Sequence, residues 1–577
     1  MSKREIFAPA AAAIPDNRGA NLYRADPDYA RLLALYLPPD LFAHLEPHFE
    51  RLGALAGGRL DELAASADRN PPTLSHRTRT GLDEQKLEKH PDYVAMERIA
   101  FGEYGLAALS HRGGVLGWPQ SMPPAAKYAL TYLFVQAEFG LCCPVSMTDS
   151  LTRTLRKFGA PDLVARYLPA LTSQDLDVLS QGSMFMTEQD AGSDVGAITT
   201  RAVRDADGTW RLYGEKWFCS NPDADLAMVL ARPDGAAAGT RGIALFLVPR
   251  VATDGTSNRY RVVRLKDKLG TRDMASGEIR LEGAQAHPVG ALDRGFKQMT
   301  DMINNSRLSN GVRAAGMMRR ALAESLFIAR NRVAFGHRLI DLPLMQRQLA
   351  KIMLRAEQAR SVAFQAAAAL EAADGGSADA YRLVRMLTPL IKFRACRDAR
   401  QATGDAMEVR GGCGYIEEWS DARLVRDAHL GSIWEGTSNV VALDVRRAVR
   451  REDALPAFEA MMRERLSRAR MADNVRDRFS EAIGRACALA REAAQPGGEM
   501  LARQSASALY HVASATGLAW EAARTGSVRR LLLAQLVLSH RVLRRDPLAA
   551  ESAEAKWLPA LLSEQPLEAS PESLALV

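Results

Sequence analysis

The stretch Ile433-Trp434-Glu435-Gly436-Thr437-Ser438-Asn439 places one carboxylate between a large aromatic side chain and a glycine, directly before a helical pattern. Thr437 or Ser438 can cap that helix at its N-terminus. An acid beside an aromatic wall loses water, which suits it to take a proton from a carbon atom. On spacing alone, the stretch fits an ordinary helix start that contains a glutamate better than it fits a catalytic site. Other segments of the sequence are needed to distinguish between these two interpretations.

The hydrophobic pattern around this stretch divides the chain into four parts after an irregular N-terminal arm at 1–25. Residues 26–180 and 291–450 have apolar side chains three and four positions apart, which predicts two helical regions, the second of them a bundle. Between them, residues 181–290 show short alternating runs separated by Gly, Asp and Pro, which predicts a compact β-domain. Residues 451–577 return to the helical pattern and end in an acidic tail, so we expect an extra helical domain there.

The composition is that of a globular protein, since 47% of the 577 residues are hydrophobic and 25% are charged. A net charge of +7 permits polyanionic partners without requiring them. The six cysteines form neither CxxC pairs nor a metal-ligand spacing, so we expect no metal site and a reducing, cytoplasmic location. We also expect no membrane association, because no run of about 18 apolar residues occurs.

Two further stretches have the composition of a ligand site. Met184-Phe-Met-Thr-Glu-Gln-Asp-Ala-Gly-Ser-Asp194 opens the β-domain with glycine and small hydroxyl residues, which allow backbone N–H groups to approach a ligand. Gly214-Glu-Lys-Trp-Phe-Cys-Ser-Asn221 places aromatic rings before a hydroxyl, a pattern that can stack on a flat ring and bind its edge. Each stretch also has a simpler interpretation, a surface loop for the first and an amphipathic strand with core aromatics for the second.

In combination with the Glu435 stretch, these segments resemble the acyl-CoA dehydrogenase family. Three more segments strengthen the resemblance: Lys268-Leu-Gly-Thr-Arg272, Arg332-Val-Ala-Phe-Gly336 and Arg410-Gly-Gly-Cys-Gly-Tyr415. The resemblance implies a mainly helical fold, with an N-terminal helical domain, a middle β-barrel domain and a C-terminal four-helix domain, here followed by the extra helical domain. It also implies a homotetramer, bound FAD, an acyl-CoA substrate and electron transfer to an electron-transfer flavoprotein.

The resemblance also implies roles for individual residues. Glu435 would be the catalytic base that removes the α-proton of an acyl thioester, while flavin N5 accepts the β-hydride. Arg307 would lie beside the substrate. Some relatives carry the base at the position of Ser306, which has no carboxylate here. The residues implied to contact FAD are Met184, Met186, Thr187, Ser193, Phe218, Ser220, Arg332, Gly411, Gly412, Trp434, Thr437 and Asn439.

Nearly the whole chain resembles the AidB-like branch of this family, in segments such as Asn21-Leu-Tyr23, Asn70-Pro-Pro72 and Cys143-Pro-Val-Ser-Met-Thr148. That branch implies an FAD-containing protein with weak dehydrogenase activity that binds duplex DNA in an alkylation response. Three functions therefore stay open. They are an acyl-CoA dehydrogenase, a DNA-binding flavoprotein with vestigial chemistry, and an oxidising enzyme for another small substrate such as a nitroalkane.

The distribution of arginines, rather than the total charge, favours DNA binding. After residue 450 there are 17 Lys and Arg against 16 Asp and Glu, but six arginines lie between 521 and 545. Arg530, Arg541 and Arg545 fall near one face of a continuous helix and Arg544 lies beside them, so these four are the candidate DNA contacts. Without a DNA-reading motif, they predict contacts to phosphates with little sequence preference. The alternative is a core helix whose terminal arginines are solvated or paired with acids.

Overall fold

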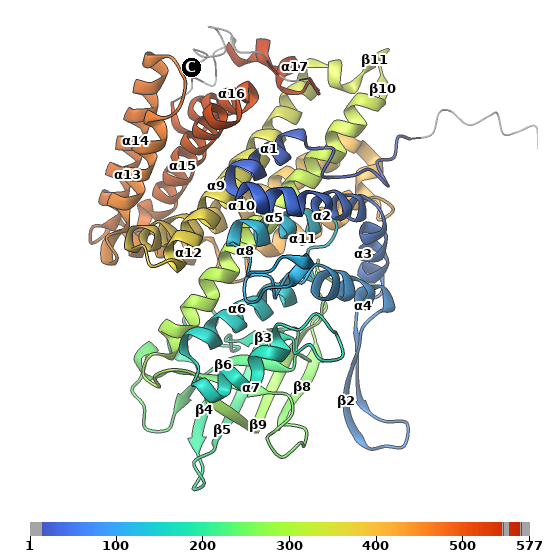
Figure 1. Cartoon of the computed structure of the whole chain (residues 1–577), viewed down its shortest axis with the longest axis vertical. Helices are drawn as coiled ribbons and strands as arrows, with labels where there is room; N and C mark the ends of the chain where they lie inside the picture. Colours follow the sequence, from blue (N-terminus) through green and yellow to red (C-terminus); the bar gives the residue numbers. More distant parts are fainter. Residues whose placement is uncertain (1–13, 545, 547, 549–552, 566, 568–577) are drawn as a thin grey trace, which may run out of the picture.

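In the computed structural model, which describes residues 14–544, 546, 548, 553–565 and 567, long helices fill the centre and a β-barrel lies at one end (Figure 1). The helices that precede the barrel are α1 (Pro27–Tyr36), α2 (Pro39–Gly57), α3 (Arg59–Arg69), α4 (Pro91–Glu97), α5 (Pro124–Phe134), α6 (Cys142–Phe158) and α7 (Pro161–Leu171). Most of them begin at a proline, whose fixed φ and missing N–H suit the first helical position. The prediction of a helical region ahead of the β-domain is confirmed.

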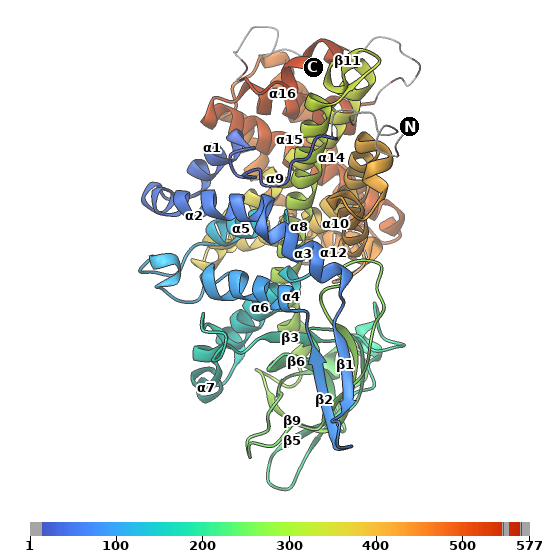
Figure 2. The same ribbon diagram turned by 90° about the vertical axis from the view of Figure 1, so that its right-hand side faces the viewer.

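A polar hairpin interrupts these helices, and the sequence analysis did not predict it. Strands β1 (Thr73–Arg77) and β2 (Asp83–Glu88) pair antiparallel and lie alongside the barrel (Figure 2). The side-chain oxygen Oε1 of Gln85 accepts the backbone N–H of Val262 at 2.6 Å, which ties the hairpin to the barrel. The hairpin lacks the alternating apolar pattern of a half-buried strand, so its sequence carried no strand signal.

The middle region is the predicted β-domain, and it closes into a barrel. Its strands are β3 (Gly182–Phe185), β4 (Arg201–Arg204), β5 (Trp210–Ser220), β6 (Leu226–Pro233), β7 (Ala244–Pro249), β8 (Tyr260–Leu265) and β9 (Ser276–Pro288). Strands β4, β5, β9, β7 and β6 pair in turn and β6 pairs back with β4, while β3 joins β6 and β8 joins β9. The ring of paired strands leaves no open edge along these five strands.

Two barrel strands form the wall between the barrel and the helices. On β6, Val229 and Ala231 belong to the apolar core inside the barrel, whereas Met228 and Leu230 belong to the larger helical core. The neighbouring strand β7 alternates in the same way and is buried along its whole length. Because successive side chains of a strand point to opposite faces, one strand serves both cores. This explains why both strands read as continuous apolar runs in the sequence.

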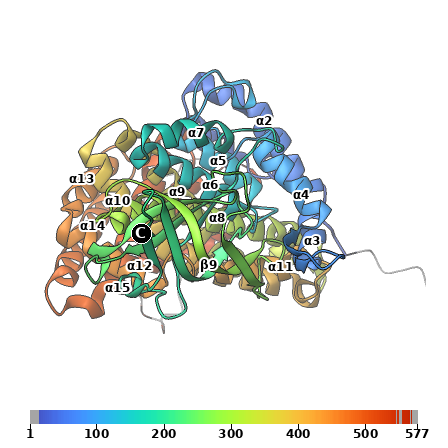
Figure 3. The same cartoon turned by 90° about the horizontal axis from the view of Figure 1, so that it is seen from below.

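The second helical region is built on three long helices and two shorter ones. Its helices are α8 (Gly295–Asn331), α9 (Pro343–Asp374), α10 (Ala378–Arg410), α11 (Ser420–Gly431) and α12 (Ser438–Arg451). Helix α8 has 37 residues and is therefore about 55 Å long. It runs from the barrel to a short hairpin of β10 (Val333–Ala334) and β11 (His337–Arg338) at the far end (Figure 1). Seen from below, the barrel lies in front of these long helices (Figure 3).

The extra helical domain follows α12 and packs along the side of the central helices. It contains α13 (Ala454–Ser467), α14 (Asp473–Ala494), α15 (Ala502–Thr525), α16 (Val528–Val537) and α17 (Leu558–Leu561). Helix α15 contacts α9, α10 and α12 and so joins the domain to the bundle. None of the helices in the described ranges combines the length and apolar composition that crossing a bilayer requires.

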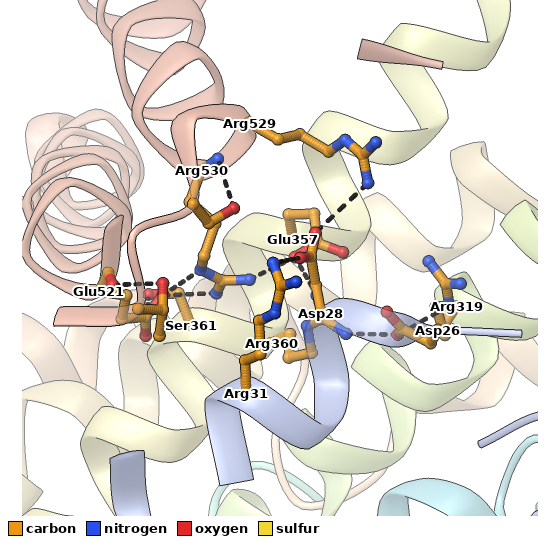
Figure 4. Close-up of polar contacts among 12 residues, drawn as sticks. Asp26, Asp28, Arg31, Arg319, Glu357, Arg360, Ser361, Glu521, Arg529 and Arg530 are labelled. Atoms are coloured by element: carbon orange, nitrogen blue, oxygen red, sulfur yellow. Dashed lines mark hydrogen bonds and ion pairs between the residues drawn. The ribbon is translucent and has the colours of Figure 1, made fainter. Parts of the chain in front are cut away.

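A buried network of charges fixes the extra domain to both earlier helical regions (Figure 4). Arg530 on α16 is 2% exposed and donates hydrogen bonds to Glu521 on α15 and to Glu357 on α9, the latter at 3.0 Å. Glu357 also accepts from Arg360 at 2.5 Å, and Arg360 donates to Asp26 immediately before α1. The prediction of Arg530 as a DNA contact is therefore wrong, because its guanidinium is enclosed by carboxylates.

The helix that was expected to place the other candidate DNA arginines on one face with Arg530 is not continuous. Helix α16 ends at Val537 and continues only as a π-helical turn over Leu538–Val542, so the regular spacing assumed for the sequence is lost. Arg541 is half-buried, and burial is the main cause that lowers its pKa. Arg544 is exposed, and Arg545 lies outside the described residues.

Candidate active site

The loop between α11 and α12 holds Glu435 in a strained backbone conformation. Glu435 has φ +55° and Gly436 has φ +103°, so the turn passes through the left-handed region at both positions. Arg307 donates from Nε to the carbonyl of Glu435 at 2.9 Å, and Lys392 donates to the carbonyl of Gly436 at 2.5 Å. A non-glycine residue in this region costs roughly 1–3 kcal/mol and persists only where its surroundings impose it, commonly at functional sites. Thr437 occupies the N-cap position but makes no side-chain capping bond.

The carboxylate of Glu435 points at helix α8. Its side chain is 6% exposed, and Ser306 donates a hydrogen bond to its Oε1 atom. Asn310 lies 3.5 Å from Oε2, and a guanidinium nitrogen of Arg313 lies 3.9 Å from Oε1. Ser306, Asn310 and Arg313 occupy one face of α8 because they are four and three positions apart. The sequence analysis missed Asn310 and Arg313, although this spacing after Ser306 was available as a signal.

The aromatic wall expected beside Glu435 is present, and a cation lies against it. Trp434 stacks on Phe139 with ring centroids 5.7 Å apart and planes at 24°. The guanidinium carbon of Arg313 is 4.9 Å from the centroid of Trp434 and 5.3 Å from that of Phe139. Both rings therefore form cation–π contacts with the same buried arginine.

Arg307, implied to lie beside the substrate, is fixed by its neighbours. Besides the bond to the carbonyl of Glu435, it donates to Asp444 on α12 at 2.8 Å. Burial lowers the pKa of Lys392 to about 8, against the effect of the neighbouring Cys396 and Glu435. Lys392 was not singled out from the sequence, because nothing in the local pattern of α10 connects it to a loop 44 residues later.

The residues implied to contact a flavin ring lie together on two neighbouring segments. The carbonyl of Thr187 accepts the N–H of Trp217 at 2.9 Å, and the hydroxyl of Ser183 donates to the carbonyl of Ser220 at 2.6 Å. Met184, Met186, Thr187 and Ser220 are partly buried, whereas the ring of Phe218 is 61% exposed. An uncovered aromatic ring beside methionines and hydroxyls has the chemistry needed to pack against a flat cofactor and to bind its edge, so these residues fit a flavin.

One buried thiol connects this segment to the loop of Glu435. Burial raises the pKa of Cys143 to about 11, and Glu435 adds to the rise. Arg313, Lys268 and a hydrogen bond with Ser220 act in the opposite direction. Both Ser220 and Glu435 influence the same thiol, which indicates that the two groups of residues belong to one site.

The loop that carries Ser193 is held by an ion pair that sequence reasoning did not identify. Ser193 itself is exposed. Glu188 accepts the N–H groups of Thr199 at 2.6 Å and Thr200 at 3.1 Å, and it pairs with the buried Lys216 at 2.8 Å. Burial alone would raise the pKa of Glu188, but Lys216 and these hydrogen bonds outweigh it and lower the pKa to about 2.

Backbone strain is concentrated in the segments that carry the family resemblance. Six described residues other than glycine have positive φ. Four of them, Asn221, Thr271, Phe335 and Glu435, lie in four of the motif segments named above. Because such conformations are maintained at a cost, their positions favour a ligand-binding interpretation of these motifs over surface loops.

A second group of implied FAD contacts lies at the far end of α8. Arg332 donates to the carbonyl of Arg410 at 3.2 Å, next to Gly411 and Gly412. Both glycines are exposed, and a Cβ on either would meet no atom within 4 Å, so the backbone is open to an approaching group. Since 26 residues of helix separate Ser306 from Arg332, this group lies about 40 Å from Glu435. Thr437 and Asn439 are exposed at the start of α12.

Family models cover most of the chain. Residues 13–178 match the adaptive response protein AidB N-terminal domain, residues 183–284 the acyl-CoA dehydrogenase middle domain, and residues 293–450 the acyl-CoA dehydrogenase C-terminal domain. The three matched ranges correspond to the helices before the barrel, the barrel, and the helices from α8 to α12.

Similar proteins agree with these models. Acyl-CoA dehydrogenase family member 11 of Caenorhabditis elegans is 31% identical over 80% of this chain and 76% of its own length. The putative acyl-CoA dehydrogenase AidB of Escherichia coli is 34% identical over 68% of this chain and 71% of its own. The crystal structure of C. elegans ACDH-11 in complex with C11-CoA superposes with a TM-score of 0.83 at 26% identity, covering 99% of this chain and 96% of that one. This chain therefore belongs to the acyl-CoA dehydrogenase family of flavoprotein oxidoreductases, and its N-terminal region is that of the AidB-like members.

Proposed function

We propose that this protein catalyses the α,β-dehydrogenation of an acyl-CoA thioester, with Glu435 as the base. The observation that carries the proposal is the setting of the Glu435 carboxylate, which is 6% exposed and is held by Ser306 and Asn310 on a left-handed backbone. A base must be fixed relative to the proton that it removes, and a buried carboxylate with two hydrogen-bond donors meets that requirement. The binding of C11-CoA by the C. elegans relative supports a CoA thioester as the ligand class.

The chain offers residues to hold a flavin against this base. Phe218 would pack on the ring system, and Thr187 and Ser220 would bind its edge, with Met184 and Met186 as apolar neighbours. Bound FAD would supply the acceptor for the β-hydride, which no protein side chain can replace. Trp434 and the barrel face would exclude water from the reacting carbon atoms, and Glu435 would hold the abstracted proton on a carboxylate oxygen.

We propose further that two subunits share each cofactor. The group around Gly411 lies about 40 Å along α8 from Glu435, so one FAD bound beside Glu435 cannot also contact Gly411 in the same chain. A second chain placed with its Arg332, Gly411 and Gly412 toward the first would complete the site, as expected for a homotetramer. The exposed apolar side chains beside these glycines support an interface there, because Phe335 is 90% and Tyr415 is 81% exposed.

The test is anaerobic mixing of the purified yellow protein with a panel of acyl-CoA thioesters while the flavin absorbance is recorded. Bleaching by one or more thioesters is the expected result, and reoxidation by an electron-transfer flavoprotein would identify the acceptor. Protein that binds no FAD when FAD is added, or holoprotein that no thioester bleaches, would refute the proposal. A nitroalkane in the same panel tests the third function that the sequence leaves open.

A second candidate function is duplex DNA binding, as the AidB-like resemblance implies. The observation that favours it is a group of arginines on α10 and α15. Burial lowers the pKa of Arg397, and the neighbouring Arg503, Arg400 and Arg394 lower it further. Asp398, which pairs with Arg394, acts in the opposite direction. The remaining repulsion favours a local positive potential that a phosphate backbone would relieve.

A further inference from the structure

The strongest unexplained feature near Glu435 is the guanidinium of Arg313. This side chain is 0% exposed, and none of its three nitrogen atoms has a hydrogen-bond partner in the structure. The indole nitrogen of Trp434 and the side-chain oxygen of Asn310, both beside it, are also buried without a partner. Buried polar groups are nearly always hydrogen-bonded, because an unmet donor destabilises the folded state. A cluster of them around one carboxylate indicates that a polar ligand completes the site.

Charge supports the same conclusion. Among the described residues, Glu435 is the one carboxylate within ion-pair distance of Arg313, at 3.9 Å. The other cations nearby have their own partners, since Arg307 pairs with Asp444 and Lys392 binds the carbonyl of Gly436. If Glu435 accepts a proton as a base, it loses its charge, and Arg313 becomes a buried cation without a counter-ion. That situation costs several kcal/mol unless the ligand supplies a negative charge.

The geometry limits which ligand group can fill this role. An arginine offers a planar fork of donors that matches a carboxylate with two parallel hydrogen bonds. The rings of Trp434 and Phe139 support the guanidinium through cation–π contacts, and none of its N–H groups has a hydrogen-bond acceptor. A plain hydrocarbon tail in this position would leave every one of these donors unmet.

We propose that Arg313 is a specificity-determining residue that binds a carboxylate on the acyl group, so that the preferred substrates are CoA thioesters of dicarboxylic acids. This inference rests on the proposed function, because it assigns the class of thioester to the same site. In contrast to a base or a cofactor ligand, Arg313 would select the substrate and leave the proton transfer to Glu435.

The experiment compares pairs of acyl-CoA thioesters of equal chain length, one ending in a methyl group and the other in a carboxylate, at several chain lengths. Binding to the FAD-loaded protein is measured by calorimetry, and flavin bleaching is measured in parallel. Since both members of a pair carry the same CoA group, the ratio of their dissociation constants isolates the end of the acyl chain. In the wild type we expect the carboxylate member to bind at least ~10-fold more tightly at the best chain length.

The variants are Arg313→Met and Arg313→Lys. Methionine keeps the apolar part of the side chain, and lysine keeps the positive charge but lacks the planar pair of N–H donors. We expect Arg313→Met to abolish or reverse the preference and Arg313→Lys to retain part of it. Arg294→Met, at an exposed arginine immediately before α8, is the control and should keep the wild-type ratio. FAD content and melting temperature establish that each variant is folded, and a ratio is insensitive to a uniform loss of active protein.

Two results would overturn the inference. One is a wild type that binds both members of each pair equally. The other is an Arg313→Met variant that weakens both members by the same factor, because Arg313 would then act on the thioester group or on Glu435. The proposed function fails separately, if no thioester bleaches the flavin, and calorimetry still decides the role of Arg313 in that case.

Discussion

The hydroxyl of Ser306 on α8 donates a hydrogen bond to the carboxylate of Glu435, although 129 positions separate the two residues in the sequence. The family resemblance implies that the base can stand at either of these positions. Here the residue at one position binds the residue at the other, so Ser306 would be a partner of the proposed base Glu435.

Removing this hydroxyl should slow proton abstraction without removing the base. For Ser306→Ala we expect flavin reduction by the best thioester to slow by about five- to tenfold, the effect of one lost hydrogen bond of about 1 kcal/mol. Rapid-mixing absorbance under anaerobic conditions measures the rate. Thr300→Ala removes a hydroxyl near the start of the same helix, bonded only to the carbonyl of Lys297, and should leave the rate unchanged. Equal losses in both variants would contradict the assigned role.

Replacing the base itself should have a much larger effect. Glu435→Gln keeps the size and the hydrogen-bonding capacity of the side chain but cannot take up the proton. We expect at least ~10²-fold slower flavin reduction with FAD still bound, the usual scale for a positioned base. Glu418→Gln, on the exposed loop before α11, serves as the matched control. A Glu435→Gln variant that reduces flavin at the wild-type rate would show that another group is the base.

Breaking the buried charge network should destabilise the fold. Arg530→Met leaves Glu521 and Glu357 as buried carboxylates without this partner, so we expect the free energy of unfolding to fall by about 3–5 kcal/mol. Arg544→Gln changes an exposed arginine near the end of the same segment and should stay within about 0.5 kcal/mol. Denaturant unfolding followed by circular dichroism compares the two variants, and similar midpoints would rule out a structural role for the Arg530 network.

A buried carboxyl group should make stability depend on pH. Asp427 accepts the N–H of Thr271 at 2.6 Å, and burial, with smaller contributions from Asp68 and Asp273, raises its pKa from 3.8 to about 7. Between these values the folded state holds a proton that the unfolded state has released, so this group lowers stability as pH rises from about 4 to 7. Each unit of pKa shift corresponds to ~1.4 kcal/mol.

Asp427→Asn should remove this dependence. We expect the variant to be more stable than the wild type at pH 8 and to differ little from it at pH 4, as measured by denaturant unfolding at both values. A constant difference between the two proteins across this range would mean that Asp427 does not hold a proton in the folded state.

The arginines of α10 and α15 provide the test of DNA binding. If duplex DNA binds there, retention at low salt should fall steeply with salt, and the variant with Arg397, Arg400 and Arg503 all changed to Gln should reduce the log–log slope by about one unit per lost phosphate contact. Arg544→Gln tests the site that the sequence favoured. No retention of the wild type at low salt would exclude this function.

The sequence was a good guide where the periodicity was strong. The pattern over Ala378–Val409 predicted a helix that the structure has at Ala378–Arg410, and Tyr260-Arg-Val-Val-Arg-Leu265 is a strand with the predicted bounds. The run Leu41–Ala65 looked like one helix, but Gly58 separates α2 from α3 there, because helical periodicity on both sides conceals a short break. The shared face expected for Arg530 and Arg541 assumed a regular α-helix, whereas Leu538–Val542 is a π-helical turn.

The site was less accessible from sequence, because its geometry depends on contacts between distant segments. Glu435 stood out by its local neighbours, whereas Arg313 lies among small residues on a long helix, and its only signal was its spacing from Ser306. Its importance appears only when Phe139, from before α6, and Trp434, from before α12, are found against the same guanidinium. A sequence pattern describes one segment at a time, so it does not indicate contacts between side chains of distant segments.

The chain of charges from Asp26 through Arg360 and Glu357 to Arg530 has a consequence for biosynthesis. A ribosome releases the segment around Asp26 long before it has made Arg530, so the nascent protein contains Glu357 without its C-terminal partner. At that stage Glu357 is paired with Arg360, but it lacks the second hydrogen bond, which Arg530 donates. Folding should therefore be completed only after synthesis of α16, and chains that end before it should be recognised and degraded by cellular quality control.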